Sequence, residues 1–266
     1  MDAESFDGAL VPLTILRSKN LALDSSHLAH LYGYAGYGIP LRPEFRPSDL
    51  AWLERGGVVA ICHARGGGEK GRAWYLAGRG PNKQNGVRDY IACAEYLSAH
   101  GYTRPSGLGA WGASMGGVLV GGAITERPDA FGAAVIEAGV LNTARFLEGV
   151  GGPTQMAELG DPRTEEGYRS LLEMDPYHAV RDGARYPAVL LSVGLNDNRV
   201  SSWHSGKFAA RLQAASGSEE PVLVRIEEDA GHGSIGSTRE QAARKEADIF
   251  SFLLWQLGDL AFQPRE

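Results

Sequence analysis

A serine set between two glycines is the feature of this sequence with the clearest chemical meaning. Ser114 lies in the segment Gly112-Ala113-Ser114-Met115-Gly116, which has the spacing of a nucleophile elbow. A strand that turns sharply into a helix strains the residue at the apex, and side chains two positions to either side would collide there. Gly112 and Gly116 avoid that collision. The spacing therefore predicts a nucleophile for acyl transfer; the alternative is a glycine-rich loop with a capping serine.

A serine nucleophile needs a general base. A hydroxyl is a weak nucleophile at neutral pH, and in enzymes with this elbow the chain order is serine, acid, histidine. Two histidines follow Ser114 and lie near the end of a late predicted strand. His232 lies in a glycine-flanked loop directly after the last strand, whereas His204 falls inside a predicted helix, where we expect a surface or capping residue. We therefore expect His232 to be the base.

The base in turn needs a carboxylate that orients it. Asp197 follows the predicted strand 189–193, at the right place in the chain. Asp161, Asp175 and Asp182 are alternatives by order, but they lie in a polar stretch where solvent-exposed acids are the usual case. We expect Asp197 to fix the tautomer of His232 and to stabilise the imidazolium without taking its proton.

Acyl transfer also requires two donors for the developing oxyanion. The residue after the nucleophile supplies one through its backbone, so the Met115 N–H is the first candidate. The second donor should come from the loop after an early strand, where Gly33-Tyr34-Ala35-Gly36 is the candidate segment. The sequence leaves open whether that donor is a backbone N–H or the Tyr34 hydroxyl.

These groups require a scaffold in which strands and helices alternate. Apolar runs and turn residues predict strands at 12–16, 28–34, 58–62, 106–111, 131–136, 188–193 and 222–226. Helices are predicted at 47–53, 85–100, 115–124, 203–215 and 240–257. This alternation predicts an α/β fold with a mostly parallel sheet, helices on both faces, and active groups at the carboxyl ends of the strands.

Composition and charge exclude some classes of partner for this chain. The chain has 266 residues, 43% of them hydrophobic, which suits one domain over residues 1–266. A net charge of -6 without a basic run argues against nucleic acid or an anionic membrane as partner and favours a small molecule or short peptide. The acidic start and the lack of a long apolar stretch favour a cytoplasmic protein. No motif indicates a metal or cofactor, and Cys62 and Cys93 are expected to be buried free thiols.

Six ordered segments together resemble the catalytic domain of the prolyl oligopeptidase family, an α/β-hydrolase. The segments are 31–37, 65–69 (Arg-Gly-Gly-Gly-Glu), 82–85 (Asn-Lys-Gln-Asn), 112–117, 197–200 (Asp-Asn-Arg-Val) and 230–233 (Ala-Gly-His-Gly). The resemblance implies a triad of Ser114, Asp197 and His232. It also implies that the Tyr34 hydroxyl and the Met115 N–H bind the oxyanion, and that Arg199 holds a substrate carbonyl.

The sequence departs from the family pattern in two ways. Family members usually carry a β-propeller that screens the active site, and this chain has no residues from which to build one. The family's proline-stacking tryptophan is also absent from residues 151–160, where Gln155 is the best match as a substrate-binding residue. A face left open by the missing propeller would favour a homo-oligomer.

An open site with fewer substrate contacts should retain ester hydrolysis more easily than peptide hydrolysis, because an alkoxide leaves more readily than an amine. The sequence therefore favours a carboxylesterase for small or medium esters. The first alternative is a serine peptidase for short peptides, or the catalytic part of a longer peptidase. A further alternative is a non-catalytic binding module on a hydrolase scaffold.

Overall fold

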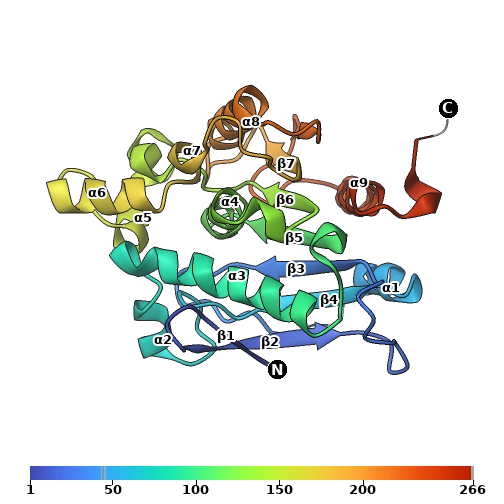
Figure 1. Ribbon diagram of the computed structural model, residues 1–266. Helices are drawn as coiled ribbons and strands as arrows, with labels where there is room; N and C mark the ends of the chain where they lie inside the picture. The colour runs from blue at the N-terminus through green and yellow to red at the C-terminus, as the bar shows by residue number, and fades with distance from the viewer. Residues whose placement is uncertain (43, 45, 265–266) are drawn as a thin grey trace.

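The chain forms one eight-stranded sheet with helices on both faces (Figure 1). The computed structural model describes residues 1–42, 44 and 46–264. The strands are β1 (Asp2–Glu4), β2 (Leu10–Leu16), β3 (Ala29–Gly33), β4 (Val58–Cys62), β5 (Leu108–Ala113), β6 (Ala133–Glu137), β7 (Ala188–Gly194) and β8 (Val222–Glu227). The α-helices are α1 (Pro47–Glu54), α2 (Arg72–Leu76), α3 (Lys83–Ala99), α4 (Gly116–Glu126), α5 (Gly152–Leu159), α6 (Glu165–Glu173), α7 (Pro176–Ala179), α8 (Trp203–Ala215) and α9 (Arg239–Leu257).

Strand order explains where a site can form. The order across the sheet is β1-β2-β4-β3-β5-β6-β7-β8. The pairs β1–β2 and β2–β4 are antiparallel, and every pair from β4 to β8 is parallel. The carboxyl ends of the parallel strands therefore lie along one edge, and the loops that carry Tyr34, Ser114, Asp197 and His232 begin there. This confirms the predicted α/β-hydrolase architecture.

The two largest clusters of the apolar core lie one on each face of the sheet, and a third, smaller cluster includes Met115 and Val118 at the start of α4. Side chains alternate along a strand, so that in β5 Ala110 belongs to the layer under α3, α4 and α8, while Trp111 belongs to the layer under α1 and α9. Figure 1 shows α3 and α4 on one side of the sheet and α1 and α9 on the other.

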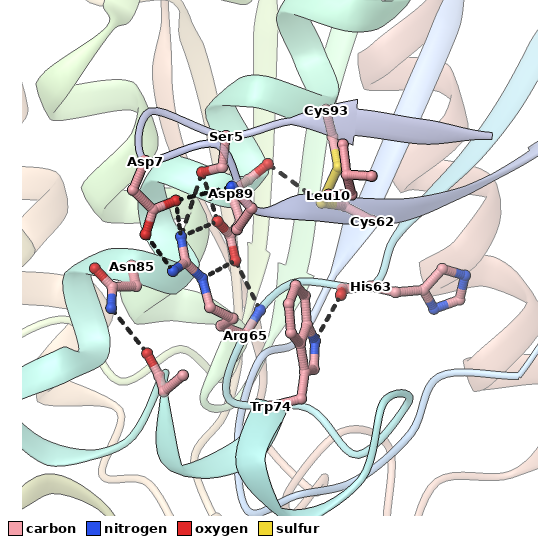
Figure 2. A network of polar contacts seen from close by, with 12 residues as sticks. Ser5, Asp7, Leu10, Cys62, His63, Arg65, Trp74, Asn85, Asp89 and Cys93 are labelled. Atoms are coloured by element: carbon pink, nitrogen blue, oxygen red, sulfur yellow. Dashed lines mark hydrogen bonds and ion pairs between the residues drawn. A yellow bond between two sulfur atoms is a disulfide. The ribbon is translucent and has the colours of Figure 1, made fainter.

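Cys62 and Cys93 form a disulfide, so the expectation of free thiols was wrong. The residues are 31 positions apart in sequence, but α3 packs against the end of β4 and brings their Cα atoms to 6.0 Å (Figure 2). The sequence carries no close cysteine pair because the partner lies on another element. The bond joins β4 to α3 covalently.

A buried polar network lies beside the disulfide (Figure 2). The Arg65 guanidinium donates to Asp89 Oδ1 at 2.6 Å and to Asp89 Oδ2 at 2.8 Å, and its Nη1 bonds to Asp7 at 2.6 Å. Ser5 Oγ donates to the same Asp89 carboxylate at 2.6 Å. The next residue, Gly66, packs so closely on the Tyr34 loop that a Cβ would lie 2.5 Å from the Ala35 oxygen. The network therefore ties the N-terminal segment and α3 to the loop after β3.

His30 is a buried histidine in β3 that lies among aromatic rings. Its ring centroid is 5.1 Å from Trp52, 5.4 Å from Trp111 and 5.9 Å from Phe250. Within the described residues, neither ring nitrogen has a hydrogen-bond partner. Burial, with a smaller contribution from Arg46, lowers the pKa of His30 from 6.5 to about 3. His30 is therefore neutral in the folded protein at neutral pH.

We expect His30 to make the protein sensitive to acid. The pKa of His30 is lower in the folded than in the unfolded state, so protonation favours the unfolded chain. The contribution of His30 to the free energy of unfolding is therefore highest above about pH 6.5 and falls as the pH drops toward about 3. His30→Leu should therefore lose about 3 kcal/mol less stability than the wild type between pH 7 and pH 4. Urea unfolding at the two pH values measures this. His100→Leu, at an exposed position on α3's C-terminus, serves as control, and equal pH dependence in all three proteins would contradict the prediction.

Over residues 1–42, 44 and 46–264, none of the helices combines the length and apolar character needed to cross a bilayer.

Candidate active site

Ser114 occupies the sharp turn between β5 and α4. Its φ is +54°, in the left-handed region that side chains other than glycine rarely adopt. A Cβ on Gly112 would lie 2.7 Å from the Gly116 oxygen, and a Cβ on Gly116 would lie 2.7 Å from the Gly33 oxygen. The Ser114 N–H donates to the Glu137 carbonyl of β6 at 2.8 Å. The predicted nucleophile elbow is thus present, and both glycines are required by close backbone contacts.

Asp197 and His232 meet at the ends of β7 and β8. Asp197 Oδ1 accepts hydrogen bonds from the N–H groups of Arg199 and Val200 at 2.8 and 2.9 Å, and Oδ2 lies 2.7 Å from His232 Nδ1. Burial raises the pKa of Asp197, but the hydrogen bonds from His232 and the two backbone groups outweigh it and hold the pKa below its usual value. An ionised carboxylate only accepts, so Nδ1 of His232 carries a hydrogen and Nε2 is available for a serine hydroxyl.

A lysine joins the His232 loop to the strand end that supports the Ser114 turn. Lys245 on α9 donates to the Gly233 carbonyl at 2.9 Å and pairs with the Glu137 carboxylate at 2.7 Å. Glu137 is the residue whose carbonyl holds the Ser114 N–H. The loop that follows β8 is therefore fixed against the end of β6, next to the elbow. Nothing in the local sequence around His232 indicates this contact, because Lys245 belongs to the last helix.

The loop after β3 brings the Tyr34 hydroxyl to Ser114. Burial raises the pKa of Tyr34, and the nearby Ser114 side chain lowers it in part. The Tyr34 side chain thus lies near Ser114, and its role as the second oxyanion donor stays a prediction. Gly36 lies against Met115, where a Cβ would come within 2.6 Å of Met115 Cγ. Met115, the N-cap residue of α4, therefore contacts the same loop through its side chain.

The two predicted substrate-binding residues lie together beside this loop. Arg199 is exposed, and its charge is among the influences that lower the pKa of Tyr34, after the effects of burial and of Ser114. Gln155 on α5 is buried and donates from Nε2 to the Arg199 carbonyl at 3.3 Å. The structure therefore joins Gln155 to the backbone of the Asp197 loop, and Arg199 to the surroundings of Tyr34.

The three aspartates that were alternatives to Asp197 as the orienting carboxylate have other contacts. Asp161 pairs with Arg163 and Asp182 with Arg211 at the surface. Asp175 is buried instead of exposed as expected, because it caps α7 and accepts from Asn142 and Ala144.

His204 lies in a helix as predicted, but it is buried and not a surface residue. Its Nδ1 accepts from the N–H groups of Leu141 and Asn142 at 3.4 and 3.1 Å. Burial lowers its pKa to about 4. These partners lie about sixty positions earlier in the chain, so the helical pattern could not indicate them. His204 acts as a neutral acceptor for backbone groups and does not compete for the role of base.

Neither a metal-binding cluster nor the main apolar groove coincides with the triad candidates in the described residues. Within the part of the chain that the structure describes, no group of three or more histidine, cysteine, aspartate or glutamate side chains could hold a metal ion. An apolar groove of about 620 Å³ lies between β8, α9 and the C-terminal turn, lined among others by Leu190, Leu223 and Trp255. This groove contains none of the triad candidates.

Comparison with known proteins agrees with the fold. Residues 43–260 match the model of the prolyl oligopeptidase family, and this chain belongs to that family. It is 38% identical to a prolyl endopeptidase of Elizabethkingia miricola over 255 residues. It is also 36% identical to a dual function macrocyclase-peptidase of Galerina marginata over 259 residues.

Solved structures of prolyl oligopeptidase family members also have the fold of this chain. A prolyl endopeptidase structure superimposes with a TM-score of 0.94 at 40% identity, covering 97% of this chain and 38% of that one. Prolyl oligopeptidase B of Galerina marginata, bound to a 35-residue substrate, gives a TM-score of 0.93 at 34% identity and covers 97% of this chain and 36% of that one.

The chain thus spans about a third of the length of the relatives that it matches. The matches cover 96% of this chain but only 36% of the Elizabethkingia protein and 35% of the Galerina protein. The names of these relatives are those of peptidases. The carboxylesterase that the sequence analysis placed first is therefore not supported, and its alternative, a serine peptidase, fits better. Leaving-group chemistry could not reveal the preference for peptides, because the same triad serves esters and amides.

Proposed function

We propose that this chain is the catalytic part of a serine peptidase that cleaves short peptides through an acyl-enzyme. The observation that carries the proposal is the 2.7 Å contact between Asp197 Oδ2 and His232 Nδ1, at the sheet edge where the Ser114 elbow lies. In the proposed mechanism, Ser114 Oγ attacks the scissile carbonyl while His232 Nε2 accepts the hydroxyl proton. Asp197 stabilises the imidazolium that forms.

The proposed oxyanion donors are the Tyr34 hydroxyl and the Met115 N–H. The raised pKa of Tyr34, caused mainly by burial, keeps the phenol protonated, so that it donates to the developing negative charge. The protonated His232 then gives its proton to the leaving amine, which departs as the acyl-enzyme forms. In the second half, His232 takes a proton from a water molecule whose oxygen attacks the acyl carbonyl. The bond between that carbon and Ser114 Oγ then breaks, and His232 returns the proton to Oγ as the acid product leaves.

We further propose that Arg199 binds a substrate carbonyl and that selectivity for proline is weaker than the name prolyl endopeptidase implies for the relatives. The polar amide of Gln155 stands at the position that best matches the family's proline-stacking tryptophan. An amide offers hydrogen bonds in place of an aromatic face, so the contact that favours a proline ring is reduced.

A substrate panel on the full 266-residue chain tests this function. Dipeptidyl amides with proline or alanine before the scissile bond are compared with a short-chain p-nitrophenyl ester. We expect amide turnover with a proline-to-alanine ratio in kcat/KM below about 100, since about 3 kcal/mol is a usual limit for one small apolar contact. Ester turnover with negligible amide cleavage would instead favour the carboxylesterase.

A further inference from the structure

The segment Asn82-Lys83-Gln84-Asn85 has no role in the proposed chemistry, yet it contains a buried cation. Lys83 is the first residue of α3 and only 3% exposed. Its Nζ donates to Glu158 Oε1 at 2.6 Å and to the Ala35 carbonyl at 2.9 Å. One ammonium group therefore connects α3 and α5 to the loop that carries Tyr34.

Glu158 completes a junction of four segments. It is 1% exposed near the end of α5, and its Oε2 accepts from the Tyr75 hydroxyl of α2 at 2.9 Å. The contacts of Lys83 and Glu158 thus bring α2, α3, α5 and the Tyr34 loop to one buried ion pair. Because α5 also carries Gln155, the pair joins the oxyanion side of the site to its substrate-binding side.

Helix stability does not account for this pair. Lys83 lies at the N-terminus of its helix and Glu158 near the C-terminus of its helix, and both positions are unfavourable for the sign of charge they carry. Burial of the two ions adds a desolvation cost that the attraction between them offsets only in part, and an apolar pair of similar volume is often equally stable. The reason for the buried Lys83–Glu158 pair must therefore lie in the backbone that the pair holds in place.

The backbone that the pair holds in place is the segment next to Tyr34. Ala35 and Tyr37 have φ values of +53° and +57°, so two non-glycine residues of the loop adopt the strained left-handed conformation. Lys83 holds the carbonyl of the first of them. Glu158 lies close enough to act on Tyr34, whose pKa is raised mainly by burial and further by this carboxylate.

We infer that Lys83 and Glu158 are positioning residues for the oxyanion hole: they hold the Ala35 carbonyl so that the Tyr34 hydroxyl points at Ser114. This inference rests on the proposed serine hydrolase chemistry, and it applies to ester and amide substrates alike. The pair does not touch the substrate. Its effect reaches the reaction through Tyr34, which makes the inference testable by coupling.

The test is a double-mutant cycle between Glu158→Gln and Tyr34→Phe in the full chain. Tyr34→Phe alone should lower kcat about 100- to 1000-fold, as for the loss of one oxyanion donor. Glu158→Gln alone should lower kcat about 10- to 100-fold, with KM changed less than about threefold, because a displaced donor loses part of that effect. In the Tyr34→Phe background, Glu158→Gln should change kcat less than about threefold. Full additivity would overturn the inference.

Two control variants separate positioning from general stability. Tyr75→Phe removes one hydrogen bond and keeps the ion pair, so we expect less than about a threefold loss in kcat. Glu126→Gln removes an exposed ion pair with Arg88 and should leave kcat unchanged. If Glu158→Gln fails to fold, Lys83→Met with Glu158→Leu removes both charges together, and this double variant should fold and show the same loss in kcat. Wild-type kcat in a folded double variant would overturn the inference.

A fluorophosphonate probe distinguishes a failure of the inference from a failure of the proposed function. Labelling of Ser114 in the wild type tests the function alone. The ratio of labelling rates between Glu158→Gln and the wild type tests the pair, and we expect the variant to label at least about tenfold more slowly. Equal rates in two folded proteins would contradict the positioning role while leaving the proposed function intact.

Discussion

Ser114→Ala should abolish labelling by a fluorophosphonate probe and lower kcat by about 10⁶, the magnitude seen when a serine hydrolase loses its nucleophile. The methyl group cannot attack a carbonyl, whereas Asp197, His232 and the oxyanion donors stay in place. Residual turnover should reflect only binding and oxyanion stabilisation. The measurement combines probe labelling, read by mass spectrometry of the modified peptide, with steady-state kinetics on the substrate that the wild type cleaves best.

The matched control is Ser106→Ala, a change at an exposed serine that precedes β5. This variant should label and turn over like the wild type. Thermal unfolding should show that Ser114→Ala is folded, because alanine adopts the same positive φ at a cost similar to that of serine. Labelling that persists in Ser114→Ala, at any other residue, would show that the nucleophile has been misassigned.

Asp197→Asn should lower kcat by about 10⁴, and the reason lies in hydrogen-bond direction. The N–H groups of Arg199 and Val200 both donate to Oδ1, so the oxygen of the new amide must face them. The amide NH₂ then faces His232 Nδ1, which can only accept. His232 is forced into the tautomer with its hydrogen on Nε2, and it can no longer take the proton of Ser114.

The control is Asp182→Asn, which alters a surface carboxylate paired with Arg211 and should leave kcat unchanged. KM of Asp197→Asn should change far less than kcat, since the substrate contacts are preserved. Burst kinetics would show slow acylation. A variant with nearly normal kcat would mean that another carboxylate orients the histidine.

Local sequence patterns predicted most of the scaffold. The unbroken apolar run 58–62 and the periodic segment 203–215 coincide with β4 and α8, because burial on one or both faces imposes the pattern directly. The short strand β1 was missed, since three residues of the sequence Asp-Ala-Glu have no recognisable period and pair only through their register with β2. Helices α5 to α7 were missed as defined elements because their segments are short and polar.

The candidate site also has parts that local sequence patterns predicted and parts that they could not predict. Ser114, Asp197 and His232 stand at the ends of strands within distinctive local segments, so chain order and turn residues were sufficient to select them. The Cys62–Cys93 bond and the burial of Asp175 depend on contacts between distant elements, and no local pattern contains them. Glu158 shows the limit most clearly, because its chemical setting depends on Lys83 and Tyr75 from two other helices.

The groups proposed for catalysis come from both ends of the chain: Tyr34 follows the third strand, and His232 follows the eighth. No contiguous half of the sequence contains a complete set. Turnover is consequently a sensitive reporter of whether the entire domain has assembled. A chain cut between β5 and β6 should be inactive until its two fragments are recombined. Fragment complementation would then be a direct assay for assembly of the domain.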